Sequence, residues 1–232
     1  MSTPHLIVHD RQGHGPTVLA LHGMASTADD WADLESRLVG RRFVAPHLPG
    51  RGPSRHVVAR PGLLGLAEAV VDAVADRDLG ETVVVGHSMG AYLAPLVASS
   101  LAERGTPVRA VLLLDGGPAP ARSILTRPAV VAALFGLAAL SHRATLSVRA
   151  ARDAVDCLSR PAQLGLLADL DAPVHLIAAT HGANRDKPAM LSDEAIQTGQ
   201  SMLPRLTWVR LEATHDSLLT HPLVAETVRR LG

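Results

Sequence analysis

Seven short apolar runs alternate with longer stretches of helical periodicity, and this alternation constrains the fold more than any other feature of the chain. The runs show little polar alternation, as is typical of strands that are covered by helices on both faces. The sequence therefore predicts an α/β fold, with a mostly parallel central sheet and helices on both of its faces. The expected strands are 6–9, 17–21, 43–48, 82–85, 110–114, 174–179 and 206–211, and the expected helices are 30–39, 63–76, 89–103, 193–202 and 222–231.

The composition narrows the class of protein. Of 232 residues, 47% are hydrophobic and 19% are charged, which allows a sizeable core and excludes intrinsic disorder. The 22 basic side chains balance the 22 acidic ones, so nucleic acid is not an expected partner. The single cysteine, Cys157, excludes an intrachain disulfide and a cysteine-rich zinc cluster. The number of subunits is left open.

The expected location is the cytoplasm. Residues 1–12 lack a basic stretch followed by an apolar run and a cleavage site. The longest apolar run, 129–140, has 12 residues, whereas a membrane-spanning helix needs about 20. We therefore expect no membrane span.

One region interrupts the alternation. Residues 118–170 contain no strand candidate, only proline-punctuated segments rich in alanine and leucine with helical spacing. Structureless connections of this length are uncommon. We expect a small helical cap, inserted into a core made of residues 1–117 and 171–232, that covers a pocket.

The sharpest chemical signal is the sequence Gly-His-Ser-Met-Gly at 86–90, directly after an expected strand and directly before an expected helix. This spacing and context predict a nucleophile elbow, in which Ser88 lies on a strained turn and the flanking glycines prevent collisions. By itself the five-residue pattern arises by chance fairly often, so its context matters.

A serine hydroxyl needs a base within hydrogen-bond reach, and the base needs an acid to hold its tautomer. His215, in a short turn after the last expected strand, is the candidate base; the alternative is an ordinary loop histidine. The backbone N–H groups of Met24 and Met89 are the candidate oxyanion donors, because such a hole uses the loop after an early strand and the residue after the nucleophile. Alternatively, both methionines only line the pocket.

With these motifs in order, the chain resembles the α/β-hydrolase superfamily in its capped, lipase- and esterase-like form, over nearly its whole length. The other landmarks are Trp31 after His22-Gly23, the loop 46–54 and Thr214-His215. Where that family usually has an aspartate that ties down this loop, the chain has His47, so we expect the loop to be held differently. The sheet is also expected to begin one strand late.

The resemblance implies an acid after the strand that follows the cap, usually three residues beyond a glycine. Asp186 is the first choice, although it comes four residues after Gly182. Asp115, at the end of the preceding strand, is the alternative, because some members of the superfamily use that position; it could instead be a structural carboxylate. Asp216 is a weaker third candidate, because its side chain would have to turn back on its neighbour.

We expect neither metal nor cofactor. His175 and His181 lack companion ligands at zinc-site spacing, and no phosphate-binding glycine motif occurs. Aromatic residues are 2% of the chain, and the expected cap offers mainly aliphatic side chains with Phe135. The expected function is hydrolysis of a small aliphatic carboxylic ester, lactone or thioester through a Ser-His-Asp triad and an acyl-enzyme. Lyase, carbon–carbon hydrolase or cyclisation chemistry, or a non-enzymatic receptor role, are the alternatives, because fold does not decide among them.

Overall fold

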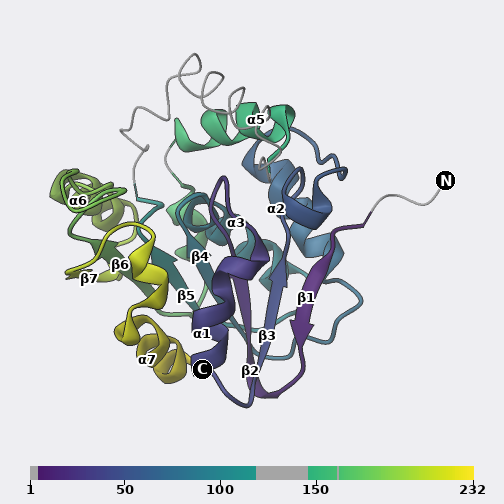
Figure 1. The fold of residues 1–232 in the computed structure, drawn as a ribbon. Helices are drawn as coiled ribbons and strands as arrows, with labels where there is room; N and C mark the ends of the chain where they lie inside the picture. The colour runs from purple at the N-terminus through teal and green to yellow at the C-terminus, as the bar shows by residue number, and fades with distance from the viewer. Residues whose placement is uncertain (1–4, 119–145, 161) are drawn as a thin grey trace.

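The computed structural model describes residues 5–118, 146–160 and 162–232 (Figure 1). Its centre is a seven-stranded sheet with strand order β1-β3-β2-β4-β5-β6-β7. β1 pairs with β3 in the antiparallel direction, and every other pair of neighbours is parallel. The strands are β1 (Val8–Arg11), β2 (His14–Leu21), β3 (Arg41–Pro46), β4 (Thr82–His87), β5 (Val108–Leu114), β6 (Val174–Ala179) and β7 (Thr207–Leu211).

All seven expected strands form, so the predicted α/β class is confirmed. The bounds of β3 differ at its C-terminal end, because the strand ends at Pro46 although the apolar run continues to Leu48. Leu48 is fully buried in the loop that follows. The predicted strand was too long because this apolar residue packs in the core without being part of the strand. Only residues 12–13 separate β1 from β2.

The helices follow the predicted order. Thr27 caps the short 3-10 helix η1 (Ala28–Trp31) before α1, and Ser192 caps α6 by accepting a hydrogen bond from the Ala195 N–H group. α3 coincides with the predicted helix, which fixes the position of the residue just before it. The helices are α1 (Ala32–Arg37), α2 (Gly62–Ala73), α3 (Met89–Glu103), α5 (Val148–Leu158), α6 (Asp193–Met202) and α7 (Pro222–Leu231).

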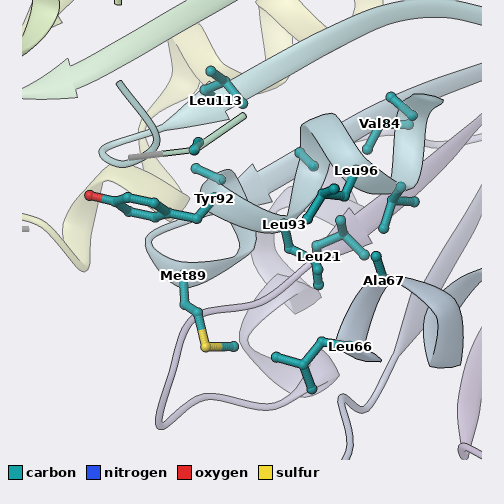
Figure 2. Close-up of a cluster of buried hydrophobic side chains, with 14 of the residues drawn as sticks. Leu21, Leu66, Ala67, Val84, Met89, Tyr92, Leu93, Leu96 and Leu113 are labelled. Atoms are coloured by element: carbon teal, nitrogen blue, oxygen red, sulfur yellow. The ribbon is translucent and has the colours of Figure 1, made fainter. Parts of the chain in front are cut away.

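Helices cover both faces of the sheet (Figure 1). Alternate strand residues pack into two separate hydrophobic clusters, because successive side chains of a strand point to opposite faces. Leu21, Val84 and Leu113 pack with residues of α2 and α3, as Figure 2 shows. On the opposite face, Val85 and Leu112 pack with residues of α1 and α7.

The expected cap is described only in part. α5 packs against α2 and α3 and lies beyond the end of the sheet toward which the parallel strands run (Figure 1), and the 3-10 helix η4 (Leu164–Leu167) follows it. Residues 119–145, which include the apolar run 129–140 and Phe135, lie outside the described residues. The division into core and cap therefore stays a prediction. Within the described ranges, no helix combines the length and the apolar character needed to cross a membrane.

Candidate active site

Ser88 occupies the turn between β4 and α3. Its backbone has φ 54° and ψ −118°, a conformation that residues with a side chain rarely adopt. Its N–H group donates a hydrogen bond to the Leu114 carbonyl oxygen at 2.9 Å, which fixes the turn against the end of β5. The side chain is only partly buried. This is the geometry predicted for a nucleophile elbow.

Three glycines permit the tight packing of this turn. A Cβ atom on Gly86 would lie 2.2 Å from the Gly90 carbonyl oxygen, and one on Gly90 would lie 1.9 Å from the Leu21 carbonyl oxygen. A Cβ atom on Gly116 would lie 2.5 Å from the carbonyl oxygen of Ser88. At each of these three positions the neighbouring backbone leaves no room for a side chain.

His215 lies in the loop after β7 and pairs with a buried aspartate. Its Nδ1 atom is 2.6 Å from Oδ2 of Asp115, whose side chain is fully buried. A carboxylate only accepts hydrogen bonds, so Nδ1 carries the proton and Nε2 presents a lone pair. The structure thus gives His215 the tautomer that a general base requires.

Asp115 is held by its own backbone as well. It follows β5 with a positive φ of 47°, which aspartate tolerates better than most residues. Its N–H group donates to the Ile177 carbonyl oxygen at 2.8 Å, and its Oδ1 atom accepts from the Ala179 N–H group at 3.0 Å. Both carboxylate oxygens therefore have a partner, and the adjacent strand β6 supplies one of them.

The preference for Asp186 as the partner of His215 is corrected by this geometry. Asp186 is exposed, and its N–H group donates to the side chain of Asn184 at 3.1 Å. It lies on the outer part of a loop that is closed by a hydrogen bond from the Gly182 N–H group to the Lys187 carbonyl oxygen, so the chain there turns outward. The third candidate, Asp216, is exposed at the start of the 3-10 helix η5 (Ser217–Thr220).

The loop after β6 nevertheless contributes to the site through its backbone. The carbonyl oxygen of Gly182 accepts a hydrogen bond from the His215 N–H group at 2.9 Å, and the N–H group of His181 donates to the Ala213 carbonyl oxygen at 3.0 Å. This loop therefore supports the backbone of His215, whereas the loop after β5 holds its ring.

His22 orients the expected oxyanion loop. Its Nδ1 atom is 2.8 Å from the Gly23 carbonyl oxygen, and its Nε2 atom accepts a hydrogen bond from the Leu48 N–H group. Burial lowers the pKa of His22 to about 3, so the ring is neutral, with its proton on Nδ1. Because the peptide that follows Gly23 is trans, its N–H group, that of Met24, points away from His22.

Two observations bear on the expected oxyanion donors. A Cβ atom on Gly23 would lie 3.3 Å from Cβ of Ser88, so the loop that carries Met24 packs against the elbow. Met89 is the first residue of α3, where helix N–H groups have no acceptor in a preceding turn. Both residues are therefore brought to the elbow, and their role as donors is a proposal.

Arg51, which the sequence analysis did not single out, ties these loops together. Its guanidinium is fully buried and donates to the carbonyl oxygens of Met24 at 2.8 Å and Pro49 at 2.6 Å, and it lies 3.3 Å from Sδ of Met89. Burial lowers the pKa of Arg51 to about 10. An arginine inside a loop rich in proline and glycine was the available signal.

The loop 46–54 is indeed held without an aspartate at its start. The Nδ1 atom of His47 accepts a hydrogen bond from the Ala28 N–H group at 3.3 Å, and burial lowers the pKa of His47. The hydroxyl of Ser54 accepts from the Ile7 N–H group at 2.9 Å. A neutral imidazole and Arg51 fix the loop in place of the usual carboxylate.

One group of potential metal ligands occurs among the residues that the structure describes. Atoms of His87, His215 and Asp216 lie within 4.8 Å of one another. His215 already binds Asp115 through Nδ1, so a metal ion there would have to take its Nε2 atom, which could then no longer accept a proton. The two histidines considered earlier bind elsewhere, His175 to Thr207 and His181 to Glu212.

A pocket of about 270 Å³ opens between the loop 49–59 and α5. Its lining includes Gly50, Arg51 and Ala150 but neither Ser88 nor His215. This pocket therefore lies beside Arg51 and does not contain the elbow.

Comparisons with known proteins find a matching family and relatives that share part of the chain. The model of the alpha/beta hydrolase family matches residues 18–227. Curated relatives include an uncharacterized protein of Mycobacterium tuberculosis, 30% identical over 83 residues, and the dihydrolipoyllysine-residue acetyltransferase component of an acetoin cleaving system of Pseudomonas putida, 33% identical over 94 residues. These matches cover 35% and 40% of this chain, and the chain spans about a quarter of the length of those relatives.

Solved structures share the fold over almost the whole chain. A marine microorganism esterase has a TM-score of 0.78 at 14% identity, covering 98% of this chain and 99% of its own. A lipase-esterase related protein from Clostridium acetobutylicum has a TM-score of 0.72 at 18% identity, covering 97% and 99%. An N-formylmaleamic acid deformylase from Pseudomonas putida has a TM-score of 0.72 at 20% identity, covering 95% and 94%.

Proposed function

Because the chain belongs to the alpha/beta hydrolase family, we propose that it is a serine hydrolase that cleaves a small aliphatic carboxylic ester, lactone or thioester. Ser88 is the nucleophile, His215 is the general base and Asp115 is the acid that orients it. The observation that carries the proposal is the 2.6 Å contact between His215 Nδ1 and a fully buried Asp115 carboxylate, beside a serine on a strained elbow.

In the first half of the reaction, His215 Nε2 takes the proton of the Ser88 hydroxyl while Oγ attacks the substrate carbonyl carbon. The imidazolium that forms is stabilised by Asp115, whose carboxylate remains ionised. His215 then donates this proton to the leaving alcohol or thiol as the carbon–oxygen or carbon–sulfur bond breaks. In a lactone the leaving hydroxyl stays attached to the acyl group.

The second half releases the acyl group. Water gives a proton to His215 and attacks the acyl-enzyme, and the proton then returns to Ser88 Oγ as the acid leaves. In both halves the N–H groups of Met24 and Met89 donate to the oxyanion, and loss of one such donor typically costs about 10²–10³ in kcat. The hydrogen bonds of His22 to Gly23 and of Arg51 to Met24 support this arrangement of the loop.

The substrate class rests on composition and on the names of the structural neighbours. Aromatic residues make up 2% of the chain, so there is little support for a substrate with an aromatic acyl group that would stack on aromatic side chains. The solved neighbours include an esterase and a lipase-esterase related protein. The proposed substrate is therefore an ester, lactone or thioester with a small aliphatic acyl group. The proposed reaction uses water and no cofactor. Within the cell, the expected location remains the cytoplasm.

The test is turnover of p-nitrophenyl esters with acyl chains of increasing length by the wild type and by Ser88→Ala. The variant should retain its melting temperature and lose at least about 10⁴ in kcat, because triad residues act as one unit. Ser99→Ala, on the same helix α3, is the matched control and should keep full activity. Turnover that persists in Ser88→Ala would contradict the proposal, and turnover of no ester by the wild type would favour lyase, carbon–carbon hydrolase, cyclisation or receptor roles.

A further inference from the structure

His87, the residue before Ser88, has no assigned part in the reaction described above. The alternation along β4 places it on the same face as Val83 and Val85. That face packs against Ala213 and Leu218, on either side of His215 in the chain. The end of β4 therefore meets the segment that carries the proposed base.

His87 contacts His215 in two ways. Its Nε2 atom is 3.1 Å from the carbonyl oxygen of His215, and the two ring centroids are 4.6 Å apart with an interplanar angle of 37°. Because a carbonyl oxygen only accepts hydrogen bonds, His87 Nε2 carries the proton and donates the hydrogen bond to the His215 carbonyl oxygen. His87 thus binds the backbone of His215 and lies against its ring.

The remaining nitrogen of His87 is buried and unsatisfied. The residue is 2% exposed, and Nδ1 has no hydrogen-bond partner. A buried polar atom without a partner is costly, whereas an apolar ring of similar size would leave no such atom. A histidine here is therefore a poor choice for core packing alone, and its one hydrogen bond is the feature that an apolar residue could not supply.

His87 is also a poor proton carrier. Burial, and next the charge of a protonated His215, lower the pKa of His87 to about 3. The ring therefore remains neutral at neutral pH. Its contribution to the site is a fixed N–H donor and a packing surface.

We propose that His87 is a positioning residue for the base: its Nε2–H group and its ring fix the backbone and imidazole of His215 so that Nδ1 meets Asp115 and Nε2 faces Ser88. The proposal rests on the proposed function, because it assigns His215 as the base.

The hydrogen bond from His87 is one of three that hold His215 in place. The N–H group of His215 donates to Gly182, its ring donates to Asp115, and its carbonyl oxygen accepts from His87. Without the third bond the peptide after His215 can rotate, and the ring can shift relative to Ser88. A misplacement of about 1 Å in an active site can cost about 10² in rate.

The experiment compares His87→Phe, which retains a ring and loses the donor, with His87→Gln, which retains an N–H donor and loses the ring. On an aliphatic p-nitrophenyl ester, His87→Phe should lower kcat by about 10- to 100-fold and leave KM within about twofold. His87→Gln should recover a substantial part of kcat. The matched control is His175→Phe on β6, a partly buried histidine bound to Thr207, which should keep wild-type kinetics.

A spectroscopic readout separates this proposal from the proposed function. The short hydrogen bond between His215 and Asp115 should give a far-downfield proton NMR resonance, and this can be recorded in the inactive Ser88→Ala background. The resonance should weaken or exchange faster when His87→Phe is added, and should be retained with His87→Gln. An unchanged resonance together with unchanged kcat in folded His87→Phe would overturn the positioning role. Failure of Ser88→Ala to abolish turnover would instead overturn the proposed function.

Discussion

The loops after β5 and β6 both carry an aspartate close to the end of a central strand, and they use it in opposite ways. After β5 the chain turns at once, and Asp115 is buried with both carboxylate oxygens hydrogen-bonded. After β6 the chain runs outward through several exposed residues, and Asp186 lies among them. The loop after β6 contacts His215 through the carbonyl oxygen of Gly182.

The difference shows that burial and the immediate turn of the backbone select the partner of His215. A carboxylate stabilises a neighbouring imidazolium most when water is excluded and its position is fixed. Asp115 meets both conditions, because its side chain is fully buried and its N–H group is bound to β6. Asp186 meets neither.

The largest expected effect separates the two aspartates. Asp115→Asn should lower kcat by about 10⁴, because an amide that donates to His215 Nδ1 favours the tautomer with its proton on Nε2, which cannot accept the Ser88 proton. Asp186→Asn should leave kcat within about twofold. Steady-state kinetics on one aliphatic ester measure both variants, and melting curves confirm that each is folded.

A larger loss of kcat in Asp186→Asn than in Asp115→Asn would show that the 2.6 Å contact between His215 and Asp115 is structural. The loop after β6 would then have to move inward to complete the site. Equal and small losses would show that His215 acts without a carboxylate partner.

A smaller effect concerns stability in acid, and it comes from two buried histidines at the same end of the sheet, His22 after β2 and His87 at the end of β4. The pKa values of the buried His22 and His87 are lowered to about 3 from 6.5, so below pH 6.5 the unfolded chain binds more protons than the folded one. Stability is therefore full above this pH and falls by roughly 1.4 kcal/mol per pH unit for each histidine, or about 4 kcal/mol for both between pH 6.5 and 5.

Urea unfolding at pH 7.5 and pH 5 measures this loss. His87→Phe should reduce the loss by about half, since one of the two histidines then no longer binds a proton on unfolding. A free energy of unfolding that is the same at both pH values would show that the two rings gain protons in the folded state.

The smallest expected effect is on the outer side of the loop after β6. A hydrogen bond from His181 lowers the pKa of Glu212, but the carboxyl is exposed to solvent, so the pair contributes little. Glu212→Gln should leave the melting temperature at pH 7 unchanged within error. A clear drop in differential scanning calorimetry would show that this exposed loop supports the fold more than its exposure indicates.

Much of the fold followed from the sequence because apolar runs and helical periods are local signals. β6, α3, α6 and α7 have the predicted bounds. The elbow at Ser88 and the loop of His215 were also predicted, because each directly follows a strand.

The partner of His215 could not be chosen from the sequence, because Asp115 and His215 are 100 residues apart and their contact depends on how two loops turn. The two glycines after Asp115 were the available signal, since they allow the immediate turn at positive φ and the close approach to Ser88. Arg51 and His22 were missed as supports of the loop that carries Met24 for the same reason: their hydrogen bonds join segments that are distant in the chain.

The most direct test of the triad is the rate and position of labelling by a serine-reactive fluorophosphonate, followed by mass spectrometry of the digested protein. The label should be found on the peptide that contains Ser88, at a rate that Asp115→Asn lowers by orders of magnitude and Asp186→Asn leaves unchanged. Labelling at another serine, or equal labelling rates in Asp115→Asn and the wild type, would contradict a site built from Ser88, His215 and Asp115.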